Sequence, residues 1–197
     1  MITKQDDFIR KLIREELKSI NENYTNKTVN IGDIYSENDN FWKWFGNSKV
    51  VNNDGKPMIV YHGTNKKFNV FKYGEFGFHL GTYEQANNIG SIILPCYLKM
   101  ENPLYTIDFP RWEGYVMSKI LNKYDIISDV EMNLVHKSKS NMDKKLKEIL
   151  INKGYDGFTY DNSFEGIGKS YIVFKSNQIK SVENDGTWDI GDENIYS

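Results

Sequence analysis

The first pattern along the chain is a stripe of apolar residues on a charged background. Between residues 5 and 22, apolar side chains recur at spacings of three to five, at Phe8, Ile9, Leu12, Ile13, Leu17 and Ile20. This spacing predicts an amphipathic helix, because residues three and four apart share one helix face. Such a helix packs on its own domain or serves in docking and oligomerisation, and the pattern leaves both open. The polar stretch 21–38 predicts a linker.

Short apolar runs and helical patterns follow without regular alternation. We predict helices over 39–47, 83–89, 112–123 and 141–152. We predict strands over 58–62, 77–80, 92–99, 156–160 and 170–175. Thr82 is the expected N-cap of the second helix. Asn102-Pro103 is expected to interrupt the regular secondary structure. The pattern over 124–140 is ambiguous. The acidic tail from Asn184 is predicted to be loose.

This mixture of helices and strands favours the α+β class over a doubly wound sheet. With 197 residues, the chain has the length of one domain with extensions. We divide it into an N-terminal helix and polar linker (1–38), a central domain (39–185) and an acidic tail (186–197).

Composition narrows the classes of function. The net charge of −2 gives no general attraction to nucleic acid or anionic lipid. With a single cysteine, Cys96, the chain forms no internal disulfide and no cysteine-based zinc site. The sequence has no apolar stretch of the roughly 20 residues that a membrane-spanning helix needs, and its start does not resemble a signal peptide. We therefore expect a soluble, cytoplasmic protein without membrane partners.

Two glycine-flanked strands carry two of the three histidines. The first is Tyr61-His62-Gly63-Thr64 and the second is Gly77-Phe78-His79-Leu80-Gly81-Thr82. A glycine at a strand end allows close approach to the backbone, although a single histidine there is commonly a structural one. Metal-ligand spacing of the HExxH kind is absent, as are a Walker loop and a GxGxxG sequence, so neither a metal site nor a Rossmann-type NAD site is predicted.

In combination, these segments resemble the ADP-ribosyltransferase fold, on its poly-ADP-ribose polymerase and diphtheria-toxin side and in its phage and polyvalent-protein branch. The segments that carry the resemblance are Trp42–Val51, Met58–Thr64, Gly77–Thr82 with Ala86, Asn102-Pro103-Leu104, Gly154–Phe158 and Tyr171–Ser181. They cover about residues 40–183. The resemblance implies a split mixed and antiparallel sheet with flanking helices.

The resemblance also implies an NAD site. His62 would form a hydrogen bond with a ribose hydroxyl of the adenosine half of NAD. The backbone of Gly63 would form hydrogen bonds with the nicotinamide amide. Thr64 and Phe78 would belong to the same site. His79 stands where the family usually has a tyrosine that stacks on nicotinamide, and an imidazole can stack as well.

The third family motif departs from the usual pattern. A glutamate is expected just before the strand that begins Tyr171-Ile172-Val173, and this chain has Ser170 there. Breaking the bond between nicotinamide and ribose builds positive charge on the ribose, which a carboxylate stabilises and a serine does not. Glu165 in the preceding loop and Gln178 after the strand are the candidate substitutes.

The hypothesis is an NAD-dependent mono-ADP-ribosyltransferase that modifies a protein or nucleic-acid acceptor. If it is encoded by a phage, the host cytoplasm or the virion is its location. The alternative is an inactive protein of the same fold that acts as a structural, virion-associated or binding module, with the helix at 5–22 for oligomerisation or assembly. A third idea is an RNase-like toxin with His62 and His79 as acid and base. Acceptor specificity is expected in the loops 65–77 and 161–169.

Overall fold

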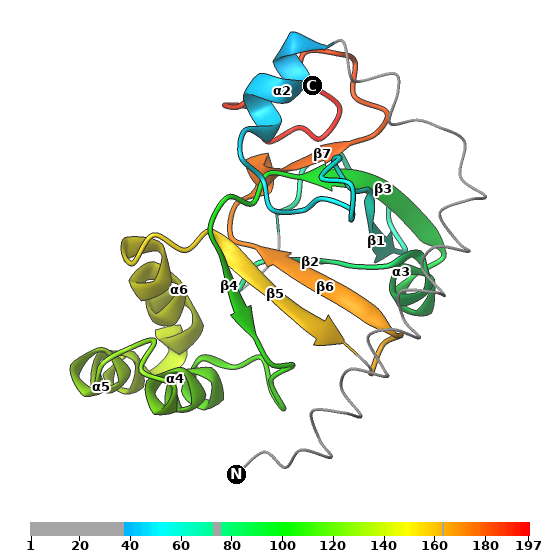
Figure 1. Cartoon of the computed structure of the whole chain (residues 1–197). Helices are drawn as coiled ribbons and strands as arrows, with labels where there is room; N and C mark the ends of the chain where they lie inside the picture. Colours follow the sequence, from blue (N-terminus) through cyan, green and yellow to red (C-terminus); the bar gives the residue numbers. More distant parts are fainter. Residues whose placement is uncertain (1–37, 73–75, 163) are drawn as a thin grey trace. The chain divides into compact units, whose positions relative to one another are not determined.

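The strands form two sheets that lie side by side (Figure 1), with a backbone bridge between Tyr61 and Gly81. The computed structural model describes residues 38–72, 76–162 and 164–197, so the helix predicted at 5–22 lies outside it. The three-stranded sheet has the order β1-β3-β7, with β1 at Val60–Thr64, β3 at Ile92–Leu98 and β7 at Ile179–Ser181. The four-stranded sheet has the order β2-β6-β5-β4, with β2 at Phe78–Leu80, β6 at Gly168–Val173, β5 at Gly157–Asn162 and β4 at Pro103–Thr106. All pairs are antiparallel except β4 with β5.

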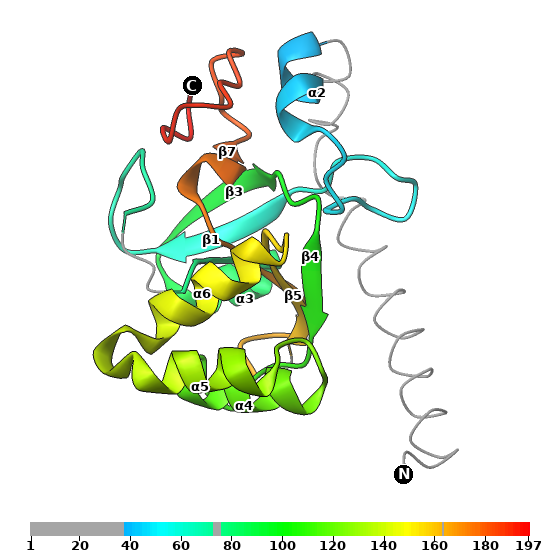
Figure 2. The same cartoon turned by 90° about the vertical axis from the view of Figure 1, so that its left-hand side faces the viewer.

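Five α-helices within the described ranges flank these sheets. They are α2 (Asp39–Phe45), α3 (Tyr83–Ile89), α4 (Gly114–Lys123), α5 (Asp129–Lys137) and α6 (Met142–Asn152). Figure 2 shows α4, α5 and α6 grouped together in front of the four-stranded sheet, and α3 packs on β1. The α+β class, with mixed and antiparallel sheets and flanking helices, is therefore confirmed.

The two faces of the four-stranded sheet contribute to two different apolar cores. Ile172 of β6 belongs to the core covered by α4, α5 and α6. Its neighbours Tyr171 and Val173 belong to the core shared with the three-stranded sheet, together with Val60 and Leu98. This division follows from strand geometry, because successive side chains point to opposite faces.

Most of the predicted elements are present with small shifts. The helix over 83–89 is confirmed, and Thr82 caps it in a capping box in which the Thr82 hydroxyl accepts from the backbone of Gln85. The first predicted strand starts two residues later than expected and includes Gly63 and Thr64. Asn102-Pro103 does not end the ordered structure, because β4 begins at Pro103 and pairs in parallel with β5.

The ambiguous region 124–140 contains α5, which begins with a second capping box between Ser128 and Glu131. The sequence signal for this helix is the Ser-x-x-Glu pattern, and Val135 is the one residue of the helix that becomes buried. The strand β7 was also missing from the prediction, because three residues are too few to show a periodic pattern.

The acidic tail is packed, so the prediction of a loose tail is wrong. The side chains of Trp188 and Ile195 are buried. The ammonium group of Lys180, a fully buried side chain, donates to the carbonyl oxygens of Asp192 at 3.1 Å and Asn194 at 2.8 Å. The sequence did not predict this packing, because most residues of the segment are acidic or polar and only a few are buried.

Candidate functional site

The site lies where β1 and β2 part. Tyr61 of β1 and Gly81, just after β2, exchange both backbone hydrogen bonds at 2.9 Å. In a continuous antiparallel ladder, the next exchange would join Gly63 and His79. The strands instead belong to different sheets, and the carbonyl of His79 accepts a hydrogen bond from the ring of His62. The peptide edge of Gly63 therefore faces the gap between β1 and β2.

The ring of His62 has a defined orientation and tautomer. Its Nδ1 lies 2.8 Å from the carbonyl oxygen of His79. Because a carbonyl only accepts, Nδ1 carries the hydrogen, and Nε2 of the neutral ring is left as an acceptor. Phe68 and Phe71 pack edge-on against the ring. Burial lowers the pKa of His62, and this effect is larger than the rise caused by the hydrogen bond to the His79 carbonyl. The balance favours the neutral form of the ring.

Gly63 is required by the packing of α3 on β1. A Cβ atom at Gly63 would lie 2.0 Å from the carbonyl oxygen of Ala86 in α3. At the other end of the helix, a Cβ atom at Gly90 would meet the backbone nitrogen of Thr64 at 2.4 Å. The Thr64 hydroxyl is engaged with the backbone of Lys66. The side-chain space of Gly63 is thus taken by α3, while its peptide edge stays on the gap.

Phe78 and His79 point to opposite faces of β2. The Phe78 ring packs against Phe71 at 5.2 Å, next to the core between the sheets. The His79 ring, which keeps an accessible surface, lies edge-on to Trp112 at 5.8 Å. Partial desolvation by the surrounding protein lowers the pKa of His79 to about 4, and the neighbouring His62 adds to the shift. Both imidazoles are therefore neutral at pH 7.

Ser170 is the centre of a buried polar cluster. Its hydroxyl donates to the Gln85 side chain at 3.1 Å and accepts from Asn162 Nδ2 at 3.0 Å. Tyr160 lies directly opposite Ser170 in β5, and burial raises the pKa of Tyr160 to about 12. A Cβ atom at Gly81 would lie 3.3 Å from the Ser170 hydroxyl, so this cluster borders the bridge between β1 and β2.

The Glu165 carboxylate reaches this cluster through Asn162. Its Oε2 atom lies 3.1 Å from the same Asn162 Nδ2 that donates to Ser170. The backbone carbonyl of Glu165 accepts from Asn88 of α3 at 2.8 Å. The structure thus links Glu165 and Ser170, which four residues separate in the sequence, through the Asn162 amide.

Gln178 lies away from this cluster. Its amide nitrogen donates to the carbonyl oxygens of Lys99 and Asp156, and its amide oxygen accepts from the backbone of Lys175. Asp156 directly precedes β5 at Gly157, which pairs with Val173, the last residue of β6 and three positions beyond Ser170. The three bonds of Gln178 tie chain segments together, and we do not include it among the proposed catalytic groups.

Four residues that border the site were not singled out from the sequence. They are Gln85, Asn162, Tyr160 and Trp112. Gln85 carries a signal, since Thr-x-x-Gln is a capping pattern, but that pattern predicts a helix start and not a bond to Ser170. The other three come from segments whose side chains meet only after folding.

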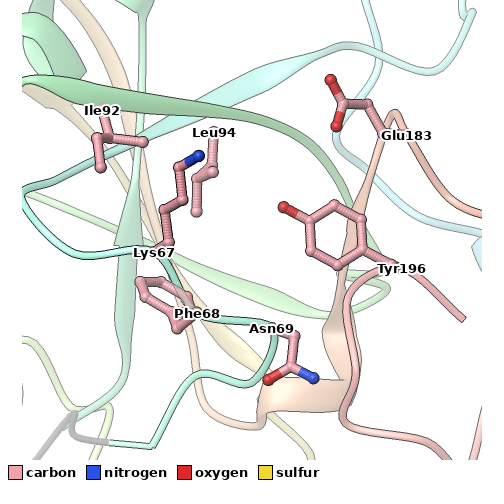
Figure 3. A pocket seen from close by; sticks show the side chains of 7 residues that line it. All are labelled: Lys67, Phe68, Asn69, Ile92, Leu94, Glu183 and Tyr196. Atoms are coloured by element: carbon pink, nitrogen blue, oxygen red, sulfur yellow. The ribbon is translucent and has the colours of Figure 1, made fainter.

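An open cavity of about 540 Å³ lies on the β1–β3 sheet beside His62 (Figure 3). It is lined by Lys67, Phe68, Asn69, Ile92, Leu94, Glu183 and Tyr196. Leu94 is the register partner of His62, and Phe68 contacts the His62 ring, so this cavity adjoins the histidine. In Figure 3, Lys67 and Leu94 lie across the opening from Glu183 and Tyr196. Its volume is typical of a small-molecule site.

Two further classes of site are absent from the described ranges. Among residues 38–72, 76–162 and 164–197, no cluster of three or more histidine, cysteine, aspartate or glutamate side chains is arranged to hold a metal ion. Over the same residues, no helix has the length and apolar character that crossing a membrane requires.

Comparison with known proteins shows to which family this chain is similar. The model of the family described as "ADP-Ribosyltransferase in polyvalent proteins" matches residues 52–188. Among solved structures, one described as "Crystal structure of an anti-CRISPR protein" is 11% identical, with 62% of this chain and 91% of that chain covered. Its TM-score of 0.35 makes this likeness too weak for any inference. No curated protein matches the chain.

Proposed function

The chain belongs to the family of ADP-ribosyltransferases in polyvalent proteins, and on this premise we propose that it transfers one ADP-ribose unit from NAD to an acceptor. The bond between nicotinamide N1 and ribose C1′ breaks, and its electron pair leaves with nicotinamide. C1′ then bonds to a nucleophilic atom of the acceptor, which loses a proton. Positive charge develops on the ribose in the transition state, so a nearby carboxylate lowers the barrier.

The observation that carries the proposal is the meeting of three features at the point where β1 and β2 part. His62 presents Nε2 as an acceptor for a ribose hydroxyl. Gly63 presents its peptide N–H and C=O to the gap, in the arrangement that pairs with a carboxamide such as that of nicotinamide. The polar cluster around Ser170 borders the same bridge.

We assign the role of the carboxylate to Glu165. Ser170 stands at the position where a glutamate is usual, and Glu165 is joined to it through Asn162. In the reaction, Glu165 would stabilise the positive ribose and receive the proton of the acceptor nucleophile. The neighbouring cavity beside Phe68 offers space for the remainder of the donor molecule.

A protein is the favoured acceptor. The loop that carries Glu165 also exposes Phe164, which is 94% accessible, and Ile167. We propose that these two exposed apolar side chains meet a protein surface, since exposed apolar patches are typical of binding sites for proteins. Lys169, in β6 beside this loop, is paired with Asp161 at 3.5 Å and adds little attraction for a nucleic-acid backbone.

The two histidines give less support to cleavage of RNA by acid and base. That mechanism needs one imidazolium and one imidazole near neutral pH. Surrounding protein lowers the pKa of both His62 and His79, so both rings are neutral under those conditions.

The test is release of nicotinamide from NAD by the full chain, together with transfer of label from adenine-labelled NAD to protein. His62→Ala should reduce release about tenfold or more, because a hydrogen bond to the donor is lost. His136→Gln is the control: His136 contacts Tyr115 and Ser118 of α4 and should leave release unchanged. No release and no transfer by the folded wild type would reject the proposal in favour of an inactive binding module.

A further inference from the structure

Resting on the proposed function, we propose that Asn162 is a positioning residue that holds the Glu165 carboxylate at the place where a glutamate at position 170 would otherwise put it. The chain then keeps a carboxylate in the site although its third motif reads serine. The role belongs to the Asn162 side-chain amide, which contacts both Glu165 and Ser170.

Asn162 uses every hydrogen-bonding group of its side chain. The oxygen Oδ1 accepts from the backbone N–H groups of Phe164 at 2.9 Å and Glu165 at 3.2 Å, which shapes the turn after β5. The nitrogen Nδ2 donates to Glu165 Oε2 at 3.1 Å and to Ser170 Oγ at 3.0 Å. The residue is only 4% exposed, so both donated bonds form in a largely desolvated place.

Ser170 and Gln85 fix the position of this amide. The Ser170 hydroxyl accepts a hydrogen bond from Asn162 and donates one to Gln85 Oε1 at 3.1 Å. Gln85 is anchored in turn, because its Oε1 also accepts from the backbone of Thr82 at 2.9 Å. The Ser170 hydroxyl and the Glu165 carboxylate thus share the Asn162 amide as a neighbour, so a glutamate at 170 would start beside the same amide.

The backbone of the Glu165 loop is held independently of the carboxylate. Gln85 Nε2 donates to the carbonyl of Gly166 at 2.8 Å, and Asn88 donates to that of Glu165 at 2.8 Å. Gly166 and Gly168 adopt φ of +144° and +141°, which a side chain would disfavour. Since these contacts hold the loop backbone, we assign to the hydrogen bond from Asn162 Nδ2 the role of orienting the Glu165 carboxylate.

Asn162→Asp separates positioning from a purely structural role. An aspartate keeps the oxygen that accepts from the turn, but it replaces the donor amide by an oxygen that repels Glu165. We expect kcat for nicotinamide release to fall by about 10²-fold, the size of effect seen when one electrostatic group is lost, with KM for NAD changing less than about threefold. The matched control is Asn177→Asp. Asn177 lies in η3 (Ser176–Gln178), and its side-chain amide donates to the carbonyl of Ile190. This variant also loses an amide donor and should retain wild-type kcat.

A second pair of variants tests the place of the carboxylate. Glu165→Gln should lower kcat about as much as Asn162→Asp. Adding Ser170→Glu to Glu165→Gln should restore at least tenfold, because the carboxylate returns to the same space from the other residue. Circular dichroism and urea unfolding check that each variant is folded.

The outcomes separate the two proposals. Wild-type release with an unchanged kcat in Asn162→Asp would overturn the role of Asn162 and leave the proposed function standing. Equal losses of kcat in Asn162→Asp and Asn177→Asp would likewise overturn it, because the effect would then not be specific to this amide. No release by the folded wild type would overturn the proposed function and the role of Asn162 with it.

Discussion

A single peptide carbonyl determines the chemistry of His62. By accepting from Nδ1, the His79 carbonyl leaves Nε2 as an acceptor, the atom that we propose faces a ribose hydroxyl. Protonation would turn Nε2 from an acceptor into a donor. The site therefore depends on the ring staying neutral, and the surrounding protein favours that state by lowering the pKa of both imidazoles.

This dependence predicts the effect of pH on donor binding. The pKa of His62 lies below its ordinary value of 6.5, so the neutral binding form predominates above that pH. The affinity for NAD should therefore decline on acidification with a midpoint below pH 6.5. Titration calorimetry at a series of pH values measures it. A decline centred above pH 6.5 would contradict the assigned state of the ring.

At the same scale, the sequence identified His62, Gly63, His79 and Ser170 through the order of their motifs. It did not reveal that Asn162 joins Ser170 to Glu165. That link depends on the turn after β5, whose shape is built from side-chain bonds to the backbone. Local patterns of apolar residues do not encode such bonds.

At the scale of elements, the C-terminal segment shows how one buried cation orders an acidic stretch. The ammonium of Lys180 in β7 donates to two backbone carbonyls. Burial lowers the pKa of Lys180, and the nearby Asp192, Asp189 and Asp185 oppose this shift. The segment in turn delivers Tyr196 to the wall of the cavity beside His62. An element predicted to be loose is thus part of the candidate site.

Lys180→Met tests this anchor. Methionine fills the space but leaves the carbonyls of Asp192 and Asn194 without their donor, which should cost about 1–3 kcal/mol of unfolding free energy. Urea unfolding measures the loss, and limited proteolysis should cut more rapidly after residue 184. The exposed Lys56→Met should change stability by no more than about 0.5 kcal/mol. Equal stability of the two variants would show that Lys180 is not an anchor.

Elements with strong periodicity or a capping signal were predictable. The helix α3 has the limits expected from its cap at Thr82, and the apolar run of β3 reads directly as a strand. The strands β4 and β7 were missed because pairing with distant segments, β5 and β3, makes them strands. A pattern confined to three or four residues does not carry that information.

At the scale of the molecule, the site is a consequence of splitting one sheet into two. Were β1 and β2 paired along their whole length, the peptide edge of Gly63 would be used within the ladder. The two sheets meet at the Tyr61–Gly81 bridge and share an apolar core that includes Val60, Leu98, Tyr171 and Val173. The family resemblance implied this split, whereas composition and periodicity alone gave only the α+β class.

The central claim is that the gap between β1 and β2 holds NAD with its nicotinamide ribose facing Glu165. The most direct measurement is a crystal structure of the full chain with a non-hydrolysable NAD analogue. We expect an adenosine ribose hydroxyl at His62 Nε2, the carboxamide on the backbone of Gly63, and the Glu165 carboxylate beside the nicotinamide ribose. An analogue bound elsewhere, or one whose nicotinamide ribose faces no carboxylate, would contradict the claim.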